Sequence, residues 1–310
     1  MSIRRLHAHG RRQHSLFTYA QAVEAGFSHE GIRRQLLRGA WQELEPLVFR
    51  ALPAAPPTFE QRLHAKILSV GGVAFGRSSV ALYKMMPSPR DAEVLVVRPG
   101  RNRSRPGLHS TRSLPPSEVT TVGGIPATMP GRSVIDACAA LPPRQCNNLV
   151  DAAVVRRLVR PHGLLKRAIE LNNSKRPGCA KVIRALASQH PGLDRARNEW
   201  EALVVRLARE FGLPAPVLNY PVVVGGQRRL LDVAWPEPKV DLEFDGFQSH
   251  MVRTAFDDDR VRQNALVDEE WKVFRATSQT LRDDPSTTFT QIATALDRRG
   301  HGSARMRAVS

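Results

Sequence analysis

Long hydrophobic runs are missing from this 310-residue sequence. No uninterrupted apolar stretch approaches the roughly 18 residues that a membrane-spanning helix needs. The first fifteen residues, MSIRRLHAHGRRQHS, are basic and lack the apolar core of a secretory signal. These absences predict a soluble, cytoplasmic protein that is not attached to a membrane.

Cysteine is scarce as well. The three cysteines, Cys138, Cys146 and Cys179, are odd in number and widely spaced, and there is no CxxC pair. Neither a zinc ribbon nor a disulfide framework is therefore supported. We expect buried free thiols in a reducing compartment.

Acidic residues are few relative to basic ones. The chain has 29 Asp and Glu against 46 Lys and Arg, which gives a formal net charge of +17. Such a charge favours a polyanionic partner, most often nucleic acid, and we expect DNA. A generally arginine-rich proteome would raise the isoelectric point in the same way without any function.

Two candidate strands follow each other in the stretch 230–245. An apolar run ends at Trp235, residues 236–239 contain two prolines and indicate a turn, and residues 240–245 alternate between apolar and acidic. The pattern predicts an antiparallel hairpin in which Trp235 pairs with Val240. Residues 217–224, followed by the turn signal Gly225-Gly226, predict a preceding strand and hence a three-stranded meander.

The same register places Asp232 directly opposite Glu243. Opposed Cβ atoms lie roughly 4.5–5.5 Å apart, so the two carboxylates repel each other unless a cation lies between them. Mg²⁺ or Mn²⁺ suits that position because both ions favour oxygen ligands. The alternative is a hairpin with an ordinary solvated acidic face, and a bulge would change the register.

This region resembles the very-short-patch-repair-like endonuclease domains of the PD-(D/E)XK superfamily, over roughly residues 197–277. The motifs that carry the resemblance are Asp232-Val233-Ala234-Trp235-Pro236, Glu243-Phe244-Asp245-Gly246, His250, Asp259-Arg260, Arg262, Asn264-Ala265-Leu266 and Trp271-Lys272-Val273-Phe274-Arg275. The resemblance implies a restriction-endonuclease-like α/β fold and Mg²⁺-dependent hydrolysis of DNA phosphodiester bonds. It also implies that Asp232 and Glu243 are catalytic metal ligands.

An acidic residue of the preceding helix often completes the metal site in that superfamily. The apolar stripe of residues 195–211 predicts such a helix, and Glu201 lies beside the stripe. Glu201 is therefore a third candidate ligand and catalytic residue, with Glu199 as the second choice. An ordinary glutamate of an amphipathic helix would give the same pattern.

The chain departs from the superfamily where a lysine would follow the glutamate, because Asp245 stands there. Asp245 would join the metal shell, and His250 would be a general base or a structural residue. Arg260, Arg262 or Lys272 would supply the missing positive charge, the first two also as DNA contacts. The absence of the lysine equally allows a fold that is retained without cleavage.

The amino-terminal segment predicts two short helices and a hairpin. Residues 17–25 form the first helix, Ser28 caps a second that ends before Gly39, and residues 41–52 form the hairpin. This order is typical of a winged helix-turn-helix, whose second helix enters the major groove.

The second helix is expected to have one face that contacts DNA and one face that is buried in the core. We expect its DNA-contacting residues to be Arg33, Arg34, Gln35 and Arg38. Its buried stripe would be Ile32, Leu36 and Leu37. A basic helix face that is merely solvated remains the alternative.

The same segment resembles the winged-helix start of AbiEi-like type IV antitoxins. The resemblance rests on Ala20-Gln21-Ala22, Ala25-Gly26, Arg38-Gly39-Ala40-Trp41 and Val48-Phe49-Arg50. It implies an alternative function, a non-catalytic DNA-binding transcriptional regulator, and it suggests a toxin or a defence system as partner.

The sequence as a whole predicts a multidomain protein of the α+β or α/β class. The expected parts are a winged helix-turn-helix at 1–58, an α/β middle scaffold at 59–192, a PD-(D/E)XK-like nuclease domain at 193–300 and a basic disordered tail at 301–310. We assign no chemistry to the middle scaffold, which would include a helix at 59–70 and a strand at 93–97.

Overall fold

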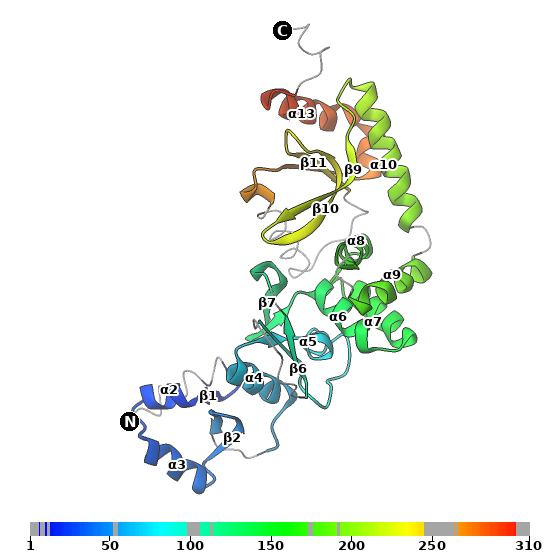
Figure 1. Ribbon diagram of the computed structural model, residues 1–310. Coiled ribbons are helices and arrows are strands. Elements are labelled where there is room, and N and C mark those ends of the chain that lie inside the picture. Colours follow the sequence, from blue (N-terminus) through cyan, green and yellow to red (C-terminus); the bar gives the residue numbers. More distant parts are fainter. Residues whose placement is uncertain are drawn as a thin grey trace. The chain divides into compact units, whose positions relative to one another are not determined.

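The chain is a mixed α/β protein in the computed structural model (Figure 1). The structure describes residues 6, 10, 13–51, 55–97, 106–111, 114–172, 176–190, 193–244, 264 and 266–301. These residues form two compact units, Met1–Pro142 and Pro143–Ser310. No helix among them is both long and apolar enough to cross a membrane.

Two short helices and a three-stranded sheet open the first unit. The elements are β1 (Leu16–Thr18), α2 (Tyr19–Glu24), α3 (His29–Leu37), β2 (Trp41–Glu45) and β3 (Val48–Ala51), with the strand order β1-β3-β2. The Ser28 hydroxyl accepts the Gly31 N–H at 3.1 Å and so caps α3, and Gly39 follows the helix with φ +69°. The predicted second helix and hairpin are thereby confirmed. The first helix begins at Tyr19 and not at residue 17, because Phe17 and Thr18 belong to β1, which the sequence did not predict.

One expectation about α3 is wrong. Ile32 is buried beside Phe27 and Trp41, but Leu37 is 78% exposed. The helix is too short to bury a wide stripe, so only one turn of its apolar side chains reaches the aromatic core. Leu37 instead shares the exposed surface of α3 with its arginines.

A five-stranded sheet with three helices forms the rest of the first unit. The elements are α4 (Phe59–Val70), β4 (Val73–Ala74), α5 (Gly76–Leu82), β5 (Val94–Val97), β6 (Leu108–Thr111), the 3-10 helix η1 (Pro116–Glu118), β7 (Val119–Val122), β8 (Ile125–Thr128) and α6 (Pro130–Ala140). The strand order is β6-β5-β4-β8-β7. Thr58 and Gln61 form a capping box that starts α4 at the predicted residue.

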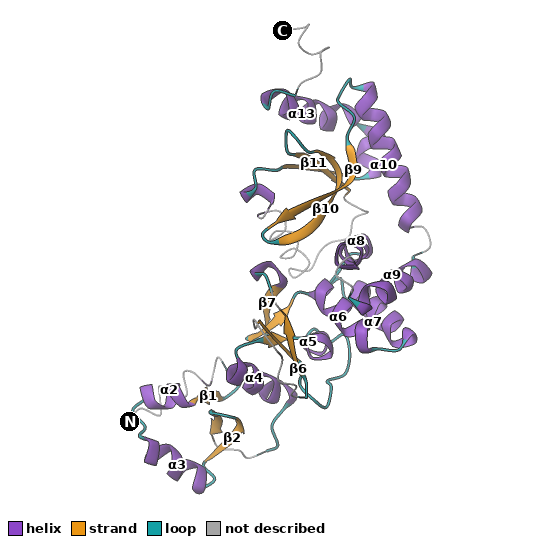
Figure 2. Ribbon diagram, in the orientation of Figure 1, coloured by secondary structure: helices purple, strands orange, loops and turns teal. Residues whose placement is uncertain are grey.

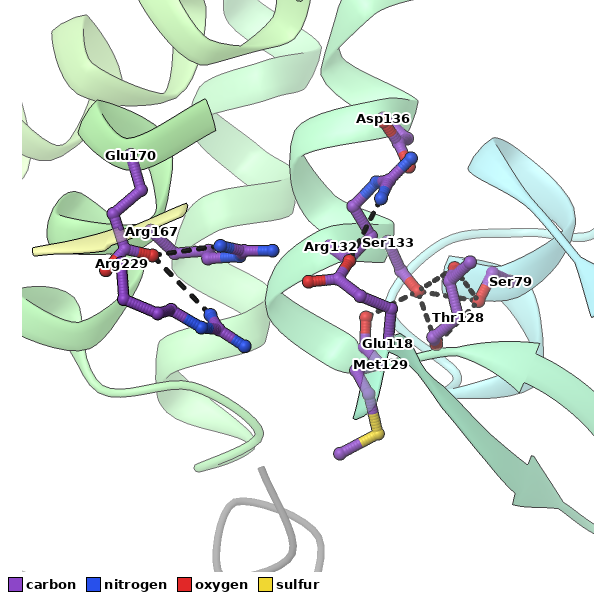
Figure 3. A network of polar contacts seen from close by, with 10 residues as sticks. All are labelled: Ser79, Glu118, Thr128, Met129, Arg132, Ser133, Asp136, Arg167, Glu170 and Arg229. Carbon is purple, nitrogen blue, oxygen red and sulfur yellow. Dashed lines mark hydrogen bonds and ion pairs between the residues drawn. The ribbon is translucent and has the colours of Figure 1, made fainter. Parts of the chain in front are cut away.

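Buried polar side chains hold α6 to this sheet (Figure 3). Arg132 pairs with Glu118 at 2.9 Å and also with Asp136, and all three side chains are nearly inaccessible. Burial disfavours the guanidinium charge, but the two carboxylates outweigh that effect and raise the pKa of Arg132. Next to it, Ser133 Oγ donates to the Thr128 carbonyl at 2.8 Å.

The second unit begins with helices and continues into a four-stranded sheet (Figure 2). The elements are α7 (Pro143–Val155), α8 (Pro161–Asn172), α9 (Pro177–Gln189), α10 (Leu193–Glu210), β9 (Val217–Val224), β10 (Gln227–Trp235), β11 (Val240–Phe244), β12 (Lys272–Ala276), α12 (Ser278–Asp283) and α13 (Pro285–Arg298). The strand order is β12-β11-β10-β9. The structure thus groups α7, α8 and α9 with this sheet, whereas the sequence interpretation placed them in the middle segment 59–192.

The sheet contains one strand more than the sequence predicts. Strands β9, β10 and β11 form the expected antiparallel meander, and β12 pairs in parallel with β11. Helices α10 and α13 cover one face, where Trp200, Val204 and Phe289 pack against Val233 and Leu242. A strand that pairs in parallel with its predecessor needs a long connection, so no tight-turn signal in the sequence predicts the pairing of β12 with β11.

A histidine pair connects the start of the chain to α4. His64 is buried, and its Nδ1 lies 3.0 Å from Nδ1 of His14. Burial, together with the charge of His14, lowers the pKa of His64 to about 4. The unfolded chain therefore takes up a proton at His64 at a higher pH than the folded chain does.

We expect the stability of the first unit to depend on pH through His64. Stability should be complete above pH 6.5 and should fall as the pH decreases towards 4, because the unfolded state binds more protons over that interval. The His64→Gln variant should show a weaker dependence of stability on pH between 4 and 6.5 than the parent, as measured by thermal unfolding at several pH values. The variant His29→Asn, at an exposed site in the same unit, is the control and should keep the slope of the parent. An unchanged slope in His64→Gln would contradict the assignment.

Candidate functional site

The hairpin of β10 and β11 has the predicted register. Trp235 pairs with Val240, Ala234 with Asp241 and Val233 with Leu242, and residues 236–239 form the turn. The next step along the two strands brings Asp232 and Glu243 together. The expectation that these carboxylates meet is confirmed by a side chain that contacts both.

That side chain is Lys166 of α8. Its Nζ lies 2.8 Å from Asp232 Oδ1 and 2.8 Å from Glu243 Oε2. The side chains are 3%, 1% and 11% exposed for Lys166, Asp232 and Glu243, respectively, so the group is buried. The second oxygen of Asp232 accepts the Phe244 N–H at 3.0 Å. The repulsion expected between the two acids is therefore offset within the chain.

No motif in the sequence points to Lys166. The residue precedes Glu243 by 77 positions and lies in a helix whose neighbours Leu164, Leu165 and Ala168 are buried. The available signal was a lysine among buried positions of a short helix, because a buried lysine needs a partner. That signal does not identify the partner.

Glu170 fixes α8 against β10, one helical turn after Lys166 (Figure 3). Its Oε1 accepts the Leu230 N–H at 2.9 Å, two residues before Asp232. Its Oε2 pairs with Arg167 at 2.9 Å and with Arg229 at 3.5 Å. A helix held to the backbone of the strand at this point keeps the Lys166 backbone at a constant position beside Asp232.

Aromatic side chains hold the end of β11. The Phe244 ring packs edge-on against His162 of α8, with centroids 5.0 Å apart, and lies 5.1 Å from the ring of Trp200 on α10. These contacts fix the strand where Glu243 leaves it. They also bring a residue of α8 and a residue of α10 next to the end of β11, beside Glu243.

Glu201 is buried on α10, and its Oε1 accepts a hydrogen bond from Asn219 Nδ2 at 3.2 Å. Asn219 occupies the register position of β9 beside Asp232, between the pairs Tyr220–Leu231 and Leu218–Val233. The structure thus connects Glu201 to the strand next to Asp232. Glu199, the second choice, is exposed.

The sheet is irregular at this position. Asn219 has φ +53°, a conformation that asparagine tolerates better than most residues. Leu231 packs with Tyr220 and Trp271, whereas Val233 packs with Trp200 on α10. Residues two apart in a regular strand face the same side, so β10 changes its facing at Asp232. Irregularities of this kind redirect a side chain next to functional sites.

A positively charged residue also lies next to Glu243 on β12, the strand that pairs with β11 on the side away from β10. Arg275 of β12 is the register partner of Glu243, and it is exposed. Lys272, which the sequence suggested as a source of positive charge, pairs with Val240 at the far end of the same strand pair. Its Nζ lies 5.7 Å from the Phe274 ring centroid. Lys272 is therefore remote from the acidic pair along the sheet.

Four of the proposed residues lie outside the described part of the chain. They are Asp245, His250, Arg260 and Arg262. Within the described ranges, no group of three or more His, Cys, Asp and Glu side chains is arranged to hold a metal ion. The described donors are thus the two carboxylates that enclose the Lys166 ammonium.

The proposed DNA-binding residues of the first unit lie on α3 and at its C-terminal cap, Arg38. Arg33, Arg34 and Arg38 are exposed, and Gln35 is half-buried. Exposed Leu37 follows Arg33 and Arg34 by one helical turn, so it lies on their face. The helix therefore presents three guanidinium groups around one apolar side chain.

Glu170→Gln should destabilise the second unit by about 2–4 kcal/mol, because a buried carboxylate that serves two arginines loses its charge. The amide oxygen keeps an acceptor for the Leu230 N–H, so the loss reports on the ion pairs. The control is Glu210→Gln, whose partner Arg206 is 60% exposed, and it should change stability by less than about 0.5 kcal/mol. Denaturant unfolding of both variants tests this, and equal stabilities would contradict the anchoring role of Glu170.

Two mycobacterial proteins are similar to this chain over most of its length. The chain is 26% identical over 251 residues to a protein of Mycobacterium tuberculosis strain CDC 1551 / Oshkosh, covering 79% of this chain and 89% of the relative. A protein of strain ATCC 25618 / H37Rv matches with the same identity and coverage. Both relatives are named only as uncharacterized proteins. No family model matches the chain.

Proposed function

We propose that this protein binds duplex DNA and hydrolyses its phosphodiester bonds with the help of Mg²⁺ or Mn²⁺. One observation carries the proposal. Two buried carboxylates on adjacent strands converge on a single cationic nitrogen, with Asp232 Oδ1 and Glu243 Oε2 each 2.8 Å from Lys166 Nζ. Oxygen atoms that already enclose one cation suit a divalent ion.

Asp232 and Glu243 would hold the ion. Glu201, whose carboxylate bonds to Asn219 one strand from Asp232, would have to turn towards the pair to become the third ligand. Once bound, the ion would activate water and stabilise charge on the scissile phosphate. His250 would accept the proton of that water, and Asp245 would add a carboxylate. Glu170 keeps α8, and with it the positive charge of Lys166, beside the reacting group.

We also infer that the second unit has a restriction-endonuclease-like fold. A long helix, α10, precedes an antiparallel meander whose second and third strands carry the two acids, and β12 extends the sheet in parallel. This order of elements agrees with the resemblance of the motifs. The fold and the acidic pair support each other because the hairpin pairs Val233 with Leu242, and Asp232 and Glu243 are the next residues of the two strands.

In the same proposal, the first unit recruits the protein to DNA through a winged helix-turn-helix. Helix α3 would enter the major groove, and the β2–β3 hairpin would be the wing. Arginine is suited to guanine and to phosphates, while an apolar side chain such as Leu37 is suited to a thymine methyl group. The net charge of +17 would speed association with DNA.

A second candidate function is a non-catalytic DNA-binding regulator, similar to a type IV antitoxin. The observation that favours it is the contact of both acids with Lys166, which offsets part of their negative charge from within the chain and so gives the pair a structural role without a metal ion. DNA binding through α3 would be retained without cleavage. Under either function the protein would act in the cytoplasm, with a toxin or a defence system as a further partner.

DNA binding should depend on α3. Arg33→Ala and Arg38→Ala in the full chain should weaken duplex binding, and each lost phosphate contact should reduce the slope of log affinity against log salt by about 1. Fluorescence anisotropy at several salt concentrations measures both quantities. Arg209→Ala, an exposed arginine of α10, is the control and should leave both unchanged. The winged-helix proposal fails if the α3 variants bind like the parent.

Cleavage should require both acids. Asp232→Asn and Glu243→Gln should each reduce Mg²⁺-dependent plasmid cleavage by at least about a hundredfold, because the ion loses a charged ligand, while DNA binding persists. Glu210→Gln is the matched control on the surface of the same unit. A parent protein that binds DNA but cuts with no divalent cation would establish the regulator instead.

A further inference from the structure

Lys166 occupies the position that a divalent ion would take. Its ammonium nitrogen is 2.8 Å from one oxygen of each acid, and its side chain is 3% exposed. The other Asp232 oxygen is engaged by the Phe244 N–H at 3.0 Å. Oδ1 is therefore the Asp232 oxygen that faces the cation, and Lys166 already uses it.

We propose that the Lys166 ammonium group is an exchangeable occupant of the cation position between Asp232 and Glu243, which a divalent ion has to displace in order to bind. This inference rests on the proposed metal site. The reason is electrostatic and steric together. The ammonium group and the divalent ion need the same two carboxylate oxygens. If both were bound to these oxygens at once, the two cations would lie close together and would repel each other strongly in a buried site.

The displacement concerns the side chain and not the helix. Glu170 ties α8 to the Leu230 N–H at 2.9 Å, and the rings of His162 and Phe244 pack at 5.0 Å, so the backbone at Lys166 is held from both sides. Lysine carries its charge on a flexible four-carbon stem that can rotate while the backbone stays in place. The ammonium group therefore leaves the acids but remains next to them.

A displaced ammonium group needs a new anionic partner, because an unpaired buried charge is costly. A phosphate group held at the ion supplies that partner. Lys166 would then provide the positive charge that β11 lacks, since Asp245 stands where the superfamily has lysine. Metal ion and phosphate should consequently strengthen each other's binding, and the effect must be reciprocal.

Calorimetric titration of Mn²⁺ into the full-length protein tests the exchange. Lys166→Gln and Lys166→Met remove the competing charge and should bind Mn²⁺ tighter than the parent, by roughly tenfold or more. Lys239→Gln, which removes an exposed lysine in the hairpin turn, should bind Mn²⁺ like the parent. Adding a short DNA duplex should tighten Mn²⁺ binding by the parent and should do so less in the Lys166 variants.

Equal or weaker Mn²⁺ binding by both Lys166 variants would overturn the proposal, even if the parent cleaves DNA. If the variants bind Mn²⁺ and the parent neither binds it nor cleaves, Lys166 is confirmed as the occupant and the nuclease function fails instead. The two proposals are thus separated.

Removing Lys166 takes a positive charge away from two buried acids and so destabilises the metal-free variants, to the point of unfolding if the loss exceeds their stability. Recovery of their folded state on adding Mn²⁺, followed by circular dichroism, would then support the exchange. If neither variant folds, the test is made on the parent protein. The rate at which Lys166 is acetylated is then measured, with the rate at Lys239 as the internal reference. That rate should rise at saturating Mn²⁺, and an unchanged rate would overturn the proposal.

Discussion

The architecture of the second unit depends on one constraint, the buried negative charge of Asp232 and Glu243 in its sheet. Asp232 and Glu243 are too deeply buried to be solvated by water, so a positive charge must reach them from elsewhere in the chain. Helix α8 supplies that charge through Lys166, and Glu170 fixes the helix to the backbone of β10. The order of helices before the sheet, the register of β10 and β11 and the irregularity at Asn219 all serve to assemble three side chains at one point.

The first unit solves a related problem in a different way. Arg132 is buried between Glu118 and Asp136, which belong to η1 and to its own helix, so its charges are matched by residues that lie close in sequence. Its guanidinium group is a rigid fork with little freedom to leave. Lys166, in contrast, is a flexible chain matched by residues of a distant hairpin. The first arrangement is suited to permanent structure, and the second is suited to exchange.

Local signals made much of this fold predictable. Two prolines after Trp235 and strict alternation from Val240 gave the hairpin register, and Ser28 and Gly39 gave the ends of α3. The acidic pair followed from register alone. Lys166 and β12 did not follow, because their contacts with β11 connect residues that are far apart in sequence, and spacing carries no information about such contacts. Leu37 was misplaced because helical periodicity does not say how wide the covered stripe is.

Lys166 lies outside residues 193–300, the range predicted for the nuclease domain, and this has a consequence for how the domain can be exchanged between proteins in evolution. A gene segment that encoded only α10 and the sheet would carry the two buried acids to a new protein without the Lys166 ammonium group that contacts both of them. Recombination at that boundary would be selected against unless the recipient offered a metal ion or a cation of its own. The helices α7, α8 and α9 should therefore travel with the sheet through evolution, even where their own sequences diverge.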